Sequence, residues 1–117
     1  MREYARVLRG SVNRQALTLA HATPLTRADA TALVALAADV YSIEPPTVRW
    51  GTWRSNGRYC PTAHRVTLPS EPDAGIVLHE VAHAVQYRGN VGESDGNHGV
   101  VFTGILDTLV EATHGLW

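Results

Sequence analysis

Cysteine is almost absent from this sequence: Cys60 is the single one among 117 residues. One thiol excludes an intramolecular disulfide framework and a cysteine-rich zinc ribbon, because both need several cysteines. Long hydrophobic runs are also lacking, since no apolar stretch reaches the ~18 residues that a membrane-spanning helix needs. The first residues carry no signal-peptide pattern. We therefore expect a soluble, cytoplasmic protein with no membrane partner, whose oligomeric state stays open.

Lysine is missing altogether, because all ten basic residues are arginine. Residues 1–70 hold nine arginines and four acidic residues, which gives a net charge of +5. Residues 71–117 hold one arginine and seven acidic residues, which gives a net charge of −6. Arginines and aromatic residues are interleaved in the middle of the chain: Arg49, Trp50, Trp53, Arg54, Arg58, Tyr59 and Arg65. This mixture can bind nucleic acid through stacking and phosphate contacts. A small sheet with one packed and one solvated face also explains it, and we favour that interpretation.

Helical periodicity predicts four helices, over residues 3–20, 26–42, 74–88 and 98–113. Thr26 is a good N-cap, with Asp29 three residues later as in a capping box. The second helix should end near Ser42, because the two prolines that follow cannot continue it. Gly89, directly after Arg88, is a typical helix-ending residue.

Short strands are predicted between the second and third helices, over residues 47–53, 58–60 and 64–68. The residues at 55–57, Ser-Asn-Gly, are typical of a hairpin turn. Pro61 limits pairing, so at least one strand should lie at a sheet edge. The pattern predicts a single α+β domain over residues 1–117, with 1–25 as an N-terminal helical extension and 26–113 as its core.

One short motif carries chemistry: His79 and His83 bracket Glu80 in the pattern HExxH. At i and i+4 of a helix, both imidazoles project from one face and can share one metal ion. A zinc ion polarises a carbonyl and lowers the pKa of its bound water toward ~7. Glu80, adjacent to both ligands, is then the candidate general base.

A catalytic zinc needs a third protein ligand and an open fourth position. His98 is our candidate, because it follows a loop that can turn back over the first two ligands. Carboxylates also bind zinc, so three alternatives stay open: Glu93, Asp95 and Glu111. The metzincin pattern is excluded, because Gln86 and Gly89 stand where its glycine and third histidine belong.

The segment from His79 to Phe102 resembles the SprT-like (Spartan-type) zinc metallopeptidases, which carry HExxH and then a third histidine in an HGxxF or HGxxW segment. Here His98-Gly99-x-x-Phe102 begins 98 − 83 = 15 residues after the second histidine, as expected for that family. The strand at 66–68 is similar to the strand that precedes the family's active-site helix. The resemblance covers residues 26–113 and is specific over 79–102.

The resemblance implies one zinc ion per chain, bound by His79, His83 and His98, with Glu80 as the catalytic base. It also implies a minimal zincin-like fold, in which a small three-stranded sheet packs against the HExxH helix and flanking helices. The expected substrate is a protein or peptide, cleaved by an endopeptidase.

Other polar residues have less support from the sequence. Tyr59 or Tyr87 could donate a hydrogen bond to an oxyanion, and Cys60 is best explained as an inert thiol. Three histidines belong to no motif and are expected at the surface or in hydrogen bonds: His21, His64 and His114.

Two functions fit these residues. The first is a small zinc peptidase. The second is a nucleic-acid- or protein-binding module that keeps zinc for stability and turns over little substrate. Glu80 favours the enzyme, because a structural zinc site needs no base and normally closes its fourth position with protein.

Overall fold

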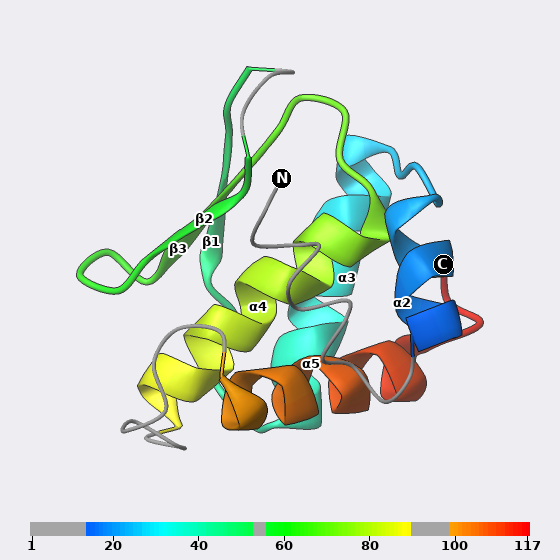
Figure 1. The fold of residues 1–117 in the computed structure, drawn as a ribbon. Coiled ribbons are helices and arrows are strands. Elements are labelled where there is room, and N and C mark those ends of the chain that lie inside the picture. The colour runs from blue at the N-terminus through cyan, green and yellow to red at the C-terminus, as the bar shows by residue number, and fades with distance from the viewer. Residues whose placement is uncertain (1–13, 53–55, 90–98) are drawn as a thin grey trace.

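The computed structural model describes residues 14–52, 56–89 and 99–117, which form four helices and a three-stranded sheet. In chain order the elements are α2 (Arg14–His21), α3 (Arg27–Val40), β1 (Thr47–Trp50), β2 (Arg58–Cys60), β3 (Arg65–Leu68), α4 (Ala74–Arg88) and α5 (Val100–Thr113). The sheet lies on one side of α4, and the other helices surround the rest of it (Figure 1). The expected α+β class is confirmed. No helix in the described ranges is long and apolar enough to span a membrane.

The helix boundaries follow the sequence pattern with small shifts. Thr26 caps α3 as expected, its Oγ1 accepting a hydrogen bond of 3.1 Å from the N–H of Asp29. The helix ends at Val40 rather than near Ser42, because Ser42 adopts a left-handed conformation with φ 55°. Helix α2 extends through His21, one residue beyond the predicted end of the first helix. Residues 3–13 of the predicted first helix lie outside the described residues.

Helix α4 spans 74–88 as predicted, but its C-terminal Gly89 has φ −80°, so this glycine is not needed for a left-handed turn. Helix α5 begins at Val100, two residues later than predicted, with Gly99 as its N-cap.

The sheet has the strand order β1-β3-β2, with β1 parallel to β3 and β2 antiparallel to it. The prediction of a hairpin turn at 55–57 is therefore wrong, because β1 and β2 are not neighbours. The hairpin lies instead at residues 61–64, between β2 and β3. The central strand β3 is also the most buried of the three, with Val66 and Leu68 fully covered. Strand β2, which precedes Pro61, lies at an edge as expected.

The two faces of the sheet differ as the favoured interpretation predicted. Val66 and Leu68 are fully buried on the face that belongs to the core. The opposite face includes Thr67, which pairs with Arg49 on one side and Arg58 on the other. Both arginines are exposed. The register thus gathers arginines on the outward face, even though they lie on different strands.

Helix α4 is the centre of the molecule. Eleven of its 15 residues are buried, and it contacts α2, α3, α5, β2 and β3. A helix buried on most sides is normally apolar all round. Two exceptions here are His79 and Glu80, which are 0% and 1% exposed.

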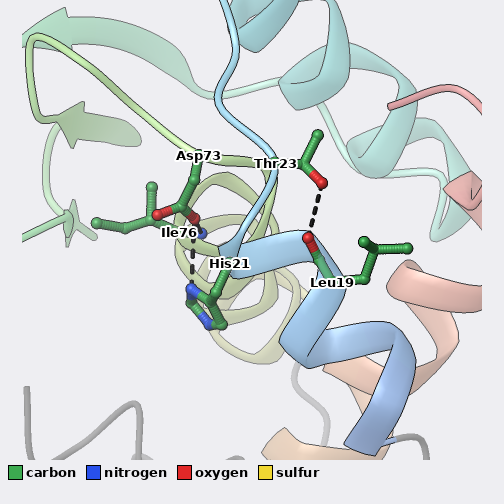
Figure 2. Close-up of polar contacts among 5 residues, drawn as sticks. All are labelled: Leu19, His21, Thr23, Asp73 and Ile76. Carbon is green, nitrogen blue, oxygen red and sulfur yellow. Dashed lines mark hydrogen bonds and ion pairs between the residues drawn. The ribbon is translucent and has the colours of Figure 1, made fainter.

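The N-terminus of α4 is anchored by Asp73, whose Oδ1 accepts a hydrogen bond of 2.7 Å from the N–H of Ile76 (Figure 2). Nδ1 of His21, at the end of α2, lies 3.3 Å from the same oxygen. Thr23 completes the turn, since its hydroxyl donates to the carbonyl of Leu19 at 2.7 Å. The end of α2 and the start of α4 are thereby held together, which positions the helix that carries the motif.

Candidate metal centre

His79 and His83 lie one turn apart on α4, with ring centroids 5.0 Å apart and ring planes at 73°. Two imidazoles that share one tetrahedral zinc at ~2.1 Å place their centroids roughly 5 Å apart. The two rings therefore have a separation that fits one zinc ion. Their i, i+4 spacing on one helix face produces this geometry.

Glu80 occupies the helix position next to His79, and its side chain is almost fully buried. Burying a carboxylate and an imidazole on a central helix costs free energy that alanine or leucine would not cost. His83 is only half-buried, so the pair of rings extends from the interior toward the surface. Ionisable groups that are buried next to a partly accessible pair of imidazole rings are typical of a functional site.

Phe102, from the first turns of α5, packs against both histidines. Its ring centroid lies 4.5 Å from that of His83 and 5.0 Å from that of His79, and the residue is fully buried. Figure 1 shows how this contact arises, because the first turns of α5 lie beside the last turns of α4. Phe102 therefore packs on the HExxH helix. Its ring restricts the orientations available to both imidazoles.

Most candidates for a third ligand lie outside the described residues. His98, Glu93 and Asp95 all fall in the range 90–98, outside them. Within the described ranges, no group of three or more histidine, cysteine, aspartate or glutamate side chains could hold a metal ion. Glu111 belongs to those ranges, and it is exposed. It lies nine residues beyond Phe102, about 13 Å along α5, and it forms no such group with His79 and His83 among the described residues.

Gly57, just before the edge strand β2, lies directly against Glu80. A Cβ atom built on Gly57 would lie 2.6 Å from Cγ, 2.8 Å from Oε2 and 3.0 Å from Cδ of Glu80. The sequence suggested only a turn at this glycine, and no local pattern indicates a contact with a residue 23 positions later.

Tyr59 and Tyr87 were both candidates to stabilise an oxyanion. The Tyr59 hydroxyl lies 2.8 Å from Nδ1 of His64, and Nε2 of His64 lies 2.6 Å from the carbonyl oxygen of Glu44. A carbonyl only accepts, so Nε2 carries the proton, and in the neutral ring Nδ1 accepts from Tyr59. The Tyr59 proton is thereby engaged. Tyr87 is 60% exposed, one turn beyond His83 on α4.

The remaining singled-out residues agree with the simpler expectations. His64 is hydrogen-bonded, His21 contacts Asp73, and His114 is exposed beside Trp117. Cys60 is a free, partly buried thiol. None of these belongs to the HExxH site.

No family model, curated protein or solved structure matches this chain.

Proposed function

We propose that this chain is a zinc-dependent metallopeptidase with a minimal zincin-like fold, similar to the SprT-like enzymes that its motif resembles. The observation that carries the proposal is the pair of imidazoles 5.0 Å apart on α4, with the buried Glu80 beside them. Two zinc-binding side chains and a carboxylate base are the parts that this chemistry requires from one helix.

Each residue has a distinct role in the proposed reaction. His79 and His83 hold the metal, and Phe102 keeps both rings in place. Bound zinc would polarise the substrate carbonyl and acidify a water molecule. Glu80 accepts a proton from the attacking water on its carboxylate and then delivers it to the leaving amine nitrogen, which is general acid–base catalysis by one group.

His98 is proposed as the third ligand. It directly precedes Gly99, the N-cap of α5, and Phe102 in the same helix contacts both histidines. A ligand from the beginning of α5 would therefore approach the pair from the side on which that helix packs. Three histidines leave the fourth zinc position open for water or substrate, as catalytic sites require.

An extended peptide is the substrate form that suits this site. Strand β2 is an edge strand, and Gly57, the residue just before it, lies against Glu80. An exposed edge offers backbone hydrogen bonds to an added strand. A peptide paired there would pass close to the proposed base, and Pro61 would limit the paired stretch.

The second candidate is a binding module in which zinc only stabilises the fold. The outward face of the sheet favours it, because Arg49 and Arg58 are exposed there on either side of Thr67. Arginines on one flat face can bind phosphates of a nucleic acid. This candidate leaves the buried Glu80 without a role, so we place it second.

The experiment that separates the two compares wild-type protein with Glu80→Gln, using casein hydrolysis and zinc content. Glutamine is nearly isosteric but cannot accept the proton, so activity should fall about 10²–10⁴-fold while one zinc per chain is retained. Glu111→Gln is the matched control, because it removes an exposed carboxylate far from the site.

Undiminished hydrolysis by Glu80→Gln would show that Glu80 is not the base. A wild-type protein that holds one zinc and hydrolyses nothing would favour the binding module.

A further inference from the structure

Gly57 has no side chain, and Glu80 lies close to where its Cβ atom would be. A Cβ atom at this position would come within 2.6–3.0 Å of three atoms of Glu80, including the carboxylate oxygen Oε2. Contacts under 3.0 Å essentially never occur for real Cβ atoms, so one of the two residues would have to move.

The glycine is required by space rather than by backbone conformation. Gly115 is the only glycine in the described ranges with a positive φ, so the backbone of Gly57 lies in a region open to other residues. The three atoms nearest to the added Cβ all belong to the side chain of Glu80, so this side chain is the first obstacle to a larger residue. Glu80 has little room to move away, because it is 1% exposed and belongs to a helix buried on most sides.

We infer that Gly57 is a positioning residue, which sets the orientation of the Glu80 carboxylate by forming a notch against which its Cγ, Cδ and Oε2 lie. This inference rests on the proposed function, because the orientation of Glu80 matters only if Glu80 handles a proton. It also couples two elements, since Gly57, just before the edge strand β2, lies against Glu80 on the central helix α4.

The contact predicts a sign change in a double-mutant cycle measured by urea denaturation. In the wild-type background, Gly57→Ala should lower the folding equilibrium constant about tenfold, because the new methyl group collides with Glu80. Glu80→Ala removes the three atoms that lie nearest to the new methyl group. In that background Gly57→Ala should be neutral or raise the constant about two- to fivefold, because alanine restricts the unfolded chain.

Gly104→Ala is the matched control. Gly104 is exposed on α5, and a Cβ there would meet nothing within 4 Å. The Gly104→Ala variant should raise the folding equilibrium constant about two- to fivefold in both backgrounds, because alanine is more favourable than glycine within a helix. An equal loss from Gly57→Ala in both backgrounds would overturn the inference. If Gly57→Ala alone does not fold, recovery of folding in the double variant supports the contact, and failure of both overturns it.

Kinetics test the positioning role itself. On casein, Gly57→Ala should lower kcat about tenfold or more, with KM and zinc content unchanged, because a displaced base affects the proton transfer and not substrate binding. A rise in KM with unchanged kcat would overturn the role. The denaturation cycle reports the contact whether or not the protein hydrolyses casein, so a failure of the proposed function is distinguishable from a failure of this inference.

Discussion

Replacing Phe102 with leucine tests whether the α5 ring orients the metal-binding histidines. The ring is fully buried and contacts two imidazoles, with centroids at 4.5 and 5.0 Å. Each aromatic pair contributes about 0.5–1.5 kcal/mol beyond burial, so losing both costs about 1–3 kcal/mol of unfolding free energy. Removing support from metal ligands typically lowers metal affinity about 10–100-fold. We expect at least a tenfold loss of zinc affinity from Phe102→Leu.

Leu109→Ala separates an effect on the ligands from a general loss of stability. Leu109 is also fully buried and lies seven residues, or two turns, further along the same face of α5. Its truncation should cost about 2–5 kcal/mol, at least as much as Phe102→Leu, yet leave zinc affinity within about twofold. Chelator competition measures the affinity, and urea denaturation measures the stability. If the zinc affinities of the two variants simply follow their stabilities, Phe102 has no specific role at the metal site.

Three further predictions concern the third ligand, the cap of α4 and the arginine face. His98→Ala should weaken zinc binding far more than Asp95→Ala in the same chelator competition, and the reverse order would identify a different third ligand. Asp73→Ala removes the side-chain acceptor at the N-terminus of α4, so the unfolding free energy measured in urea should fall by about 1 kcal/mol; an unchanged value would show that the cap contributes nothing. DNA binding should be weak and salt-dependent, and replacing both Arg49 and Arg58 with glutamine should reduce the log–log salt slope by roughly two, whereas nanomolar affinity that is insensitive to salt would contradict this.

The HExxH geometry was predictable because it depends on neighbours within one helix. Residues 74–88 carry an N-cap before them and a glycine after them, so the helix and its bounds follow from local signals. Once the helix exists, the i, i+4 spacing places both histidines on one face. Helical periodicity likewise predicted the last helix, and the structure places Phe102 on its buried face.

The strand order was not predictable in the same way. The turn signal at 55–57 indicated a hairpin between the first two strands. In the structure, β3 instead lies between β1 and β2, and its Val66 and Leu68 are fully buried. A parallel pair such as β1 and β3 joins segments that are separated by another strand. No local signal specifies that choice.

The sequence by itself determined the helices, the residues of the motif and the alternation that separates the arginine face of the sheet from its core face. Only the tertiary structure decided that Gly57 lies against Glu80, that Glu111 is exposed on α5 and that Tyr59 is engaged by His64. The physical reason is the range of the forces involved. Helix formation and capping act over about four residues along the chain, whereas these contacts depend on how complete elements pack in space.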